Sequence, residues 1–322
     1  MSWFNKAAPK AVMAAAVMAG ALAAATAAHA ADKFLLGLVS IAADEANNVR
    51  FIRGAQKEAA SLGWDVSVVD AQGSADRANA AIQNLVQRGA GAVIDLVFPV
   101  SSIGAGLAAA HEKNIPVATW GGGLGNGVVA TNGSGGPLAD PIIRMLVKNM
   151  DGKGEVLALT YHTGEVCRQR EEVMDAILKD HPDIHVTKNE VRIPGYFQDG
   201  AQYAGAWLAA HPAGSGNLAI WGCWDDPAIG AISQLRSQGR TDVKVYGENG
   251  NAQAIENIRG GYMTATAWQD SFTEGQVMVK TLKQVLDQGA AWQPKAVEVP
   301  AVVVTKDTVD QFVKDHPDAV GN

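Results

Sequence analysis

Short apolar runs alternate along the chain with longer segments whose apolar residues recur every three or four positions. A short apolar run is typical of a buried strand, and the three-to-four spacing is typical of an amphipathic helix. Before residue 121 the expected strands are Phe34–Ser40, Trp64–Asp70, Ala92–Val97 and Ile115–Trp120. The expected helices between them are Asn47–Leu62, Ala75–Arg88 and Ser102–Lys113. This order predicts a parallel sheet with helices on both faces.

The rhythm then breaks at a glycine-rich segment, residues 121–136. It matches no phosphate-binding glycine pattern, so we interpret it as a crossing between two lobes, where glycine absorbs backbone rotation. A second series of strands and helices follows. Its expected strands are Glu155–Tyr161, Ile184–Val191, Leu218–Trp221, Val243–Gly247, Met263–Trp268 and the extended segment Val297–Thr305. Its expected helices are Pro137–Met150, Cys167–Asp180, Asp199–His211, Asp225–Gln238, Ala252–Arg259, Phe272–Asp287 and Thr308–Asp315. The predicted fold class is therefore α/β, with two doubly wound parallel-sheet lobes.

The first thirty residues have the pattern of a secretory signal peptide. Lys6 and Lys10 precede an apolar, alanine-rich run, and a small-x-small cleavage pattern ends at Ala30. We expect cleavage there and a mature chain in the periplasm. A membrane anchor is the alternative, but the run is only weakly hydrophobic.

Charge and cysteine content narrow the range of partners. The formal net charge is −7, and loss of the signal peptide with its two lysines makes it more negative. An acidic chain without a basic run argues against nucleic acid as a partner. The chain has two cysteines, Cys167 and Cys223, each after a strand of the second lobe. Because these strands are neighbours in a flavodoxin-like order and the compartment is oxidising, we expect a disulfide; two buried free thiols are the alternative.

The stretch from Leu218 to Ile232 holds two tryptophans at the turn between a strand and a helix. Asp225, Asp226 and Pro227 suit the first turn of that helix. In open α/β sheets such turns lie at the ligand-binding edge. We expect Trp221, which ends the strand, to be in the core and Trp224 to face a ligand; burial of both in the core is the alternative.

In the order and spacing of several short motifs, the chain resembles the periplasmic sugar-binding proteins of ABC importers, the ribose-binding-protein group. These motifs are Leu38-Val-Ser40, Gly54-Ala-Gln-Lys-Glu-Ala59, Asn114-Ile-Pro-Val117, Cys167-Arg-Gln-Arg170, Asp225-Asp-Pro-Ala-Ile-Gly-Ala231, Val245-Tyr-Gly-Glu-Asn-Gly250 and Ala265-Thr-Ala-Trp-Gln269. The resemblance covers nearly all of the mature chain. It implies a type I periplasmic binding protein whose two lobes, joined by a three-crossing hinge, close on a ligand. The expected lobes are residues 31–132 with 270–294, and residues 133–269 with 295–322.

The resemblance also implies a set of ligand contacts. They are Asp44, Asn47, Asn48, Trp120, Gly121, Arg168, Phe197, Trp224, Asn249 and Gln269. The chain departs from the family at Asn47 and Asn48, where relatives have aromatic residues, and at Gly121, where many have a charged residue. Trp224 and Asn249 replace the Asn and Asp of many members.

Polar side chains that can form two hydrogen bonds, together with aromatic rings, suit a sugar or polyol, whose hydroxyls surround an apolar C–H face. We expect a neutral ligand, although Arg168 leaves an anionic group open. The expected function is capture of a small sugar or polyol and delivery to a membrane permease by a monomeric protein. No cofactor, metal site or catalytic group is expected.

Three other functions remain as alternatives. The effector domain of a lactose-repressor-like regulator would need a basic DNA-binding domain where the signal peptide stands. An exported α/β enzyme would need a nucleophile motif or a metal cluster, and neither pattern occurs in the sequence. A receptor that carries ligand for chemotaxis cannot be separated from a transport protein by sequence.

Overall fold

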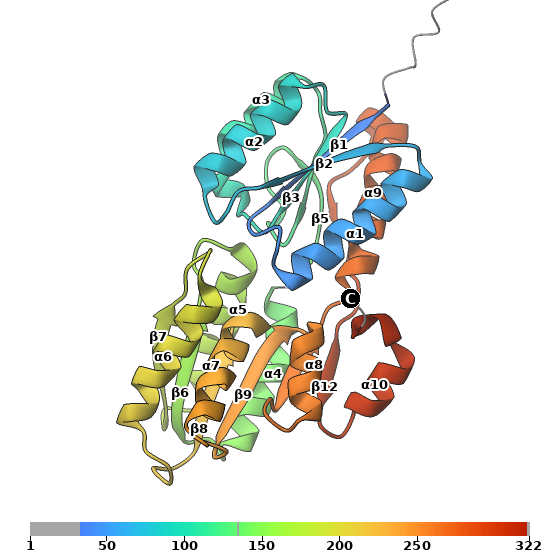
Figure 1. Ribbon diagram of the computed structural model, residues 1–322. Helices are drawn as coiled ribbons and strands as arrows, with labels where there is room; N and C mark the ends of the chain where they lie inside the picture. Colours follow the sequence, from blue (N-terminus) through green and yellow to red (C-terminus); the bar gives the residue numbers. More distant parts are fainter. Residues whose placement is uncertain (1–32, 134, 321–322) are drawn as a thin grey trace, which may run out of the picture. The chain divides into compact units, whose positions relative to one another are not determined.

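The structure is a computed structural model that describes residues 33–133 and 135–320. The predicted signal peptide, residues 1–30, lies outside the described residues. The described chain builds two six-stranded sheets (Figure 1). We call each sheet with its helices a lobe, the first lobe containing the sheet of β1 and the second lobe the sheet of β6. The predicted α/β fold with two parallel-dominated lobes is confirmed.

The first lobe has the strand order β11-β5-β4-β3-β1-β2, and all of its pairs are parallel. Its strands are β1 (Leu35–Ser40), β2 (Asp65–Asp70), β3 (Ala92–Leu96), β4 (Val117–Trp120), β5 (Val128–Asn132) and β11 (Lys295–Ala296). The central strands β1, β3 and β4 are almost wholly buried, as expected where helices cover both faces of a parallel sheet.

The helices of the first lobe form two packed pairs, one on each face of the sheet (Figure 1). They are α1 (Ala46–Ser61) with α9 (Ser271–Gln288), and α2 (Ala75–Gln87) with α3 (Gly104–Glu112). Glycine allows α1 and α9 to approach closely. A Cβ added at Gly54 would lie 1.9 Å from the carbonyl oxygen of Phe272, and one at Gly275 would lie 2.2 Å from that of Phe51. No larger residue fits either position without moving the backbone.

The second lobe repeats this plan with the strand order β12-β10-β9-β8-β6-β7. Its strands are β6 (Gly154–Thr160), β7 (Ile184–Glu190), β8 (Leu218–Gly222), β9 (Val243–Asn249), β10 (Ala265–Trp268) and β12 (Val302–Thr305). Its helices are α4 (Gly136–Asn149), α5 (Glu165–Leu178), α6 (Tyr196–Ala210), α7 (Asp225–Ser237), α8 (Ala252–Arg259) and α10 (Val309–Asp315). One pair departs from the expected parallel pattern, because β12 runs antiparallel to β10.

The chain passes between the lobes in three places. It leaves the first sheet after β5, returns between β10 and α9, and crosses again between β11 and β12. The third crossing lies later than expected. Lys295 and Ala296, which we assigned to the second lobe, pair with Ala130 and Thr131 in the first sheet. Backbone hydrogen bonds to β5 hold these two residues in the first sheet. Such pairing at a sheet edge cannot be predicted from the apolar pattern of the sequence.

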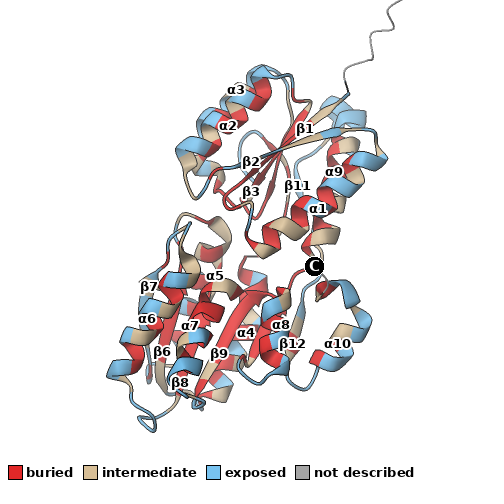
Figure 2. Cartoon of the chain, viewed as in Figure 1, coloured by how far each residue is buried: buried red, intermediate tan, exposed pale blue. Residues whose placement is uncertain are grey.

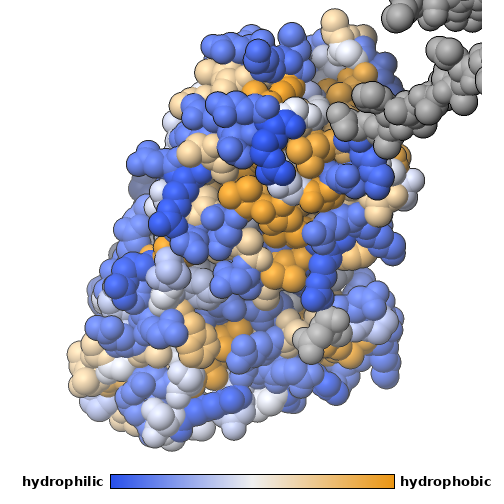
Figure 3. All heavy atoms as spheres, turned by 45° about the horizontal axis from the view of Figure 1, so that its top comes forward, coloured by the Kyte–Doolittle hydropathy of each residue, from blue (hydrophilic) through white to orange (hydrophobic). Residues whose placement is uncertain are grey.

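Buried residues concentrate on the two sheets and on the helix faces that cover them (Figure 2). In the view of Figure 3 hydrophilic residues cover most of the surface, and hydrophobic residues show in a smaller central area. Within residues 33–320 no helix combines the length and the apolar character needed to cross a bilayer.

Candidate functional site

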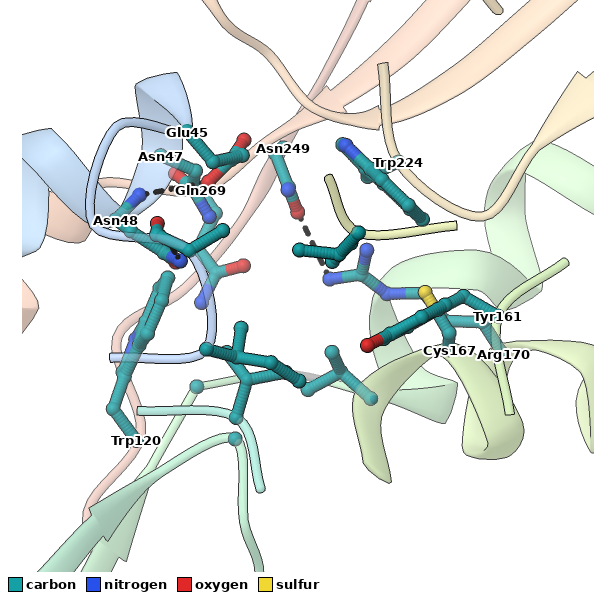
Figure 4. Close-up of a pocket in the computed structure, with 17 residues that line it drawn as sticks. Glu45, Asn47, Asn48, Trp120, Tyr161, Cys167, Arg170, Trp224, Asn249 and Gln269 are labelled. Carbon is teal, nitrogen blue, oxygen red and sulfur yellow. Dashed lines mark hydrogen bonds between the residues drawn. The ribbon is translucent and has the colours of Figure 1, made fainter. Parts of the chain in front are cut away.

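A pocket of about 500 Å³, its open mouth included, lies where the carboxyl ends of strands from both lobes meet (Figure 4). Seven of the expected contacts line it: Asn47, Asn48, Trp120, Gly121, Trp224, Asn249 and Gln269. They belong to different strands and helices, so the fold rather than local sequence brings them together.

The start of α1 forms one part of the first-lobe wall. Glu45 caps this helix, because its Oε2 accepts a hydrogen bond from the backbone N–H of Asn48 at 2.8 Å. Asn48 Nδ2 donates to the carbonyl oxygen of Ala42 at 2.7 Å and to Ser40 Oγ at 3.2 Å. Asn48 is thus held in a fixed position at the pocket.

Trp120, the last residue of β4, forms another part of this wall (Figure 4). Its ring packs on Phe51 with a centroid separation of 4.8 Å, and its Nε1 donates to Glu274 Oε2 at 2.7 Å. Gln269 Nε2 donates to the same carboxylate oxygen at 2.7 Å. Burial nevertheless raises the pKa of Glu274 to about 7, since desolvation outweighs these two hydrogen bonds.

The second lobe supplies the aromatic wall opposite Trp120 (Figure 4). Trp224 lies edge-on to Tyr161 and Tyr196, with ring centroids 5.9 and 5.5 Å away. Its Nε1 has no hydrogen-bond partner among the described residues. A buried indole N–H usually has a partner, so this donor is suited to a ligand. Trp221 is fully buried, as predicted, and donates to Glu248 Oε1 at 3.2 Å.

The arginine that lines the pocket is Arg170, two residues after the expected Arg168. Arg170 is 2% exposed and donates to the carbonyl oxygen of Cys223 at 2.6 Å and to Asn249 Oδ1 at 3.0 Å. Arg168 instead points to the surface, where it pairs with Glu165 and the carbonyl oxygen of His162. Two residues along a helix turn a side chain by about 200°, so only one of the two arginines faces the pocket.

Asp44 and Phe197, which we expected in the same site, lie in a neighbouring pocket. The two pockets share Ala42 and Ile193 in their linings. The neighbouring pocket also contains Asp70 and Tyr196. Apart from Arg168, the expected contacts are therefore divided between an inner pocket with Trp120 and Trp224 and an adjoining pocket with two acidic residues.

The expected disulfide is not formed, and both cysteines are buried free thiols. The fold does bring them together, since Cys167 lies in the first turn of α5, after β6, and Cys223 follows the neighbouring strand β8. The thiol of Cys167 lies 3.8 Å from the carbonyl oxygen of Cys223 and points to that backbone group. Burial, followed by the neighbouring thiol of Cys167, raises the pKa of Cys223.

Two residues at the pocket hold an unusual backbone conformation. Val97 follows β3 with a φ of 82°, and Asn249 ends β9 with a φ of 94°. Positive φ is costly for a β-branched residue such as valine. Such strain clusters at functional sites when the surrounding structure over-determines it. Here Val97 donates its N–H to Trp120 at 2.8 Å and accepts from the N–H of Glu165, in the other lobe, at 3.2 Å.

Glu45, an acidic residue of the pocket lining, lies at the upper edge of the pocket in Figure 4. Asp225 and Asp226, in the first turn of α7, lie near it. Burial raises the pKa of Asp225 to about 7 and that of Asp226 well above its usual range. Among the residues that the structure describes, no three side chains of His, Cys, Asp or Glu are arranged to hold a metal ion.

Sequence reasoning missed Glu45, Tyr161 and Arg170 as pocket residues. A signal for Arg170 was present. It lies three residues after Cys167 and four before Met174, on the buried stripe of α5. No comparable pattern marks Glu45, because a helix cap and a pocket residue look alike in a sequence.

The periplasmic binding protein domain model matches residues 36–291, and the chain belongs to that family. A curated relative, the ribose import binding protein of Escherichia coli K12, is 29% identical over 280 residues, covering 84% of this chain and 90% of the relative.

Solved structures agree in fold. A solute-binding protein of an ABC transporter from Agrobacterium vitis, with bound allitol, has a TM-score of 0.81 at 24% identity, covering 88% of this chain and 99% of that one. An ABC sugar transporter subunit from Rhodobacter sphaeroides has a TM-score of 0.78 at 25% identity, covering 85% and 98%. The predicted resemblance to ribose-binding-protein-like periplasmic proteins is confirmed.

Proposed function

We propose that this protein captures a small neutral sugar or polyol in the pocket between its lobes and delivers it to an ABC permease. The observation that carries the proposal is the pairing of tryptophans on opposite walls with amide side chains between them. Trp120 and Trp224 offer apolar surfaces to C–H groups, and Asn47, Asn249 and Gln269 offer hydrogen bonds to hydroxyls. The relative that imports ribose supports the same ligand class.

A neutral ligand fits the charges at the pocket better than an anion does. Arg170 already donates to the carbonyl oxygen of Cys223 and to Asn249, so its charge is engaged by groups of the protein. The buried acid Glu45 would repel an anionic ligand at the opposite end. An anion would therefore lose its hydration without a free cationic partner.

The same proposal places the protein in the periplasm as a binding protein without catalytic activity. Its lobes, taken as residues 31–132 with 270–296 and residues 133–269 with 297–322, would close around the ligand. The first range includes the two residues of β11, in keeping with their pairing in the first sheet.

A thermal-shift screen of sugars, polyols and sugar acids tests this function. A ligand present at 100 times its dissociation constant stabilises the folded protein by about 2.7 kcal/mol. D-Ribose and allitol are included because they occur with similar proteins. We expect shifts with neutral polyhydroxylated compounds, none with sugar acids, and recovery of the ligand unchanged after incubation.

Trp224→Ala serves as the matched control, because it removes one wall of the pocket. Loss of a buried aromatic anchor should weaken binding by about 1–3 kcal/mol. Shifts confined to sugar acids, or chemical conversion of the ligand, would contradict the proposal.

A further inference from the structure

Two carboxyl groups from opposite lobes, one buried and one half-buried, meet beside the pocket. Glu45 precedes α1 in the first lobe, and Asp226 lies in the first turn of α7 in the second lobe. Glu45 is 7% exposed and lines the pocket. The two side chains interact with each other, and the buried oxygens Glu45 Oε1 and Asp226 Oδ2 have no donor among the described residues. This contact joins the lobes directly, so it exists only while they are together.

In each carboxyl group, one oxygen accepts a hydrogen bond from another residue. The second oxygen is left for the other carboxyl group of the pair. Glu45 Oε2 accepts the N–H of Asn48, and Asp226 Oδ1 accepts from Asn251 Nδ2 at 3.3 Å. The second oxygens, Glu45 Oε1 and Asp226 Oδ2, have no donor from any other described side chain or backbone group. Each therefore needs the proton that the pair itself can hold.

The surroundings of the pair contain one cation and one further acid. The groups that face it are Arg50 on α1, Asp225 on α7 and Tyr196 at the start of α6, and Tyr196 in turn faces Asp44 and Asp70 of the first lobe. Arg50 is the cation among them. Its guanidinium donates to Asn47 Oδ1 at 2.8 Å and to the carbonyl oxygens of Asn249 and Gly250 at 2.8 and 3.3 Å. It lowers the pKa of Glu45 only in part, because burial has the larger effect.

Two ionised carboxylates cannot form a hydrogen bond, since neither has a donor, and at this separation they repel each other. With one proton the same pair forms a strong, charge-assisted bond between an acid and a carboxylate. We propose that Glu45 and Asp226 form a proton-dependent latch, in which one shared proton joins the lobes as they close. The inference rests on the proposed function in one respect, namely that closure accompanies ligand binding.

The latch predicts that ligand binding takes up a proton. With the lobes apart both carboxyls are solvated and ionised at neutral pH, with pKa values near the ordinary 3.8 to 4.5. In the closed arrangement burial raises both values. Closure is therefore fully favoured below the open-state pKa values, and the advantage is lost as pH rises through the closed-state value. Within that window the dissociation constant should rise about tenfold per pH unit.

Calorimetry tests the latch with D-ribose and allitol as probes, in two buffers of different ionisation enthalpy at pH 7. The natural protein should take up protons on binding, and Glu45→Gln should take up fewer. Glutamine keeps the helix cap through its oxygen and donates its amide to Asp226 without a proton. Asp226→Asn should behave like Glu45→Gln. Glu112→Gln, an exposed substitution on α3, should keep the uptake of the natural protein.

The outcomes separate the latch from the proposed function. Binding without proton uptake, or equal uptake in the natural protein and Glu45→Gln, would overturn the latch and leave the function standing. If neither probe binds, small-angle scattering of the ligand-free protein from pH 5 to 9 decides. A radius of gyration that rises with pH in the natural protein, but not in Glu45→Gln, supports the latch. A radius that is independent of pH in both overturns it.

Discussion

At the scale of single residues, Arg170 and Arg168 form a natural matched pair. We expect Arg170→Gln to weaken ligand binding at least tenfold, because buried hydrogen bonds from a charged donor contribute about 1.5–3 kcal/mol each. It removes those to Cys223 and to Asn249, of which Asn249 lines the pocket. Arg168→Gln should change affinity less than threefold, since an exposed ion pair contributes roughly 0–1 kcal/mol. Calorimetric titration of both variants with the ligand found in the screen measures the difference.

The melting temperature of the two variants provides the control for that comparison. Arg170 is buried, so its substitution should also lower the melting temperature of the ligand-free protein, whereas Arg168→Gln should leave it nearly unchanged. Equal losses of affinity in the two variants would contradict the assignment of Arg170 to the pocket.

Glu274 gives the stability of the protein a dependence on pH. Burial raises its pKa to about 7 from an ordinary value of 4.5. The folded state thus holds a proton that the unfolded chain releases, and this contribution is complete below about pH 4.5 and lost as pH rises through 7. At most it amounts to about 3 kcal/mol. The free energy of unfolding, measured with urea from pH 5 to 8, should therefore fall.

Glu274→Gln should reduce that fall without abolishing it. The amide oxygen of the glutamine can still accept a hydrogen bond from Trp120. Asp225 also remains, and because burial raises its pKa to about 7, it lowers the free energy of unfolding over the same pH range. An unchanged pH slope in this variant would show that Glu274 does not titrate in this range.

At the scale of helices and strands, the packing of α1 on α9 leaves no space for a side chain at Gly54. An added Cβ would lie 1.9 Å from the carbonyl oxygen of Phe272, so one of the helices must shift. We expect Gly54→Ala to destabilise the protein by about 1–3 kcal/mol or more, as overpacking does. Gly104→Ala is the matched control, because a Cβ at that helix start meets no atom within 4 Å. Urea unfolding of the two variants should differ clearly, and equal stabilities would refute the close packing.

Most helices and strands could be predicted from the sequence, because each needs only a local apolar pattern. The predicted helix 252–259 agrees with α8, and β7 differs from its prediction by one residue. The pairing of β11 with β5 could not be predicted, since two exposed residues carry no apolar pattern. The local sequence determines which segments can form helices or strands. Pairing at the edge of a sheet depends instead on which edge strand still has unpaired backbone groups.

The candidate site was predictable at strand ends and at the first turn of α1, where Asn47 and Asn48 line the pocket. Trp120 and Trp224 stand next to strand ends, and both line the pocket. Arg168 and Phe197 lie on helices, where a shift of two residues reverses the direction of the side chain. Neither lines the inner pocket. A motif match fixes such positions in the sequence but not the face of the helix on which they lie.

At the scale of the whole described chain, ligand should change the arrangement of the lobes. Trp120 and Gln269 lie on one side of the pocket, and Trp224 and Arg170 lie on the other (Figure 4). A ligand can contact both sides only when the lobes are together, and a ligand shifts a conformational equilibrium only through such differential affinity. The three crossings would absorb the backbone rotation of a hinge.

We therefore expect the radius of gyration, measured by small-angle X-ray scattering, to fall when the ligand found in the screen saturates the protein. Trp224→Ala at the same ligand concentration should show little change, because it lacks one wall of the pocket and leaves the crossings intact. The bonds that join the lobes, such as that from Arg50 to the carbonyl oxygen of Asn249 at 2.8 Å, form without ligand atoms. A ligand-free radius equal to the saturated one would therefore mean that these bonds alone hold the lobes together, and that ligand binding is not coupled to closure.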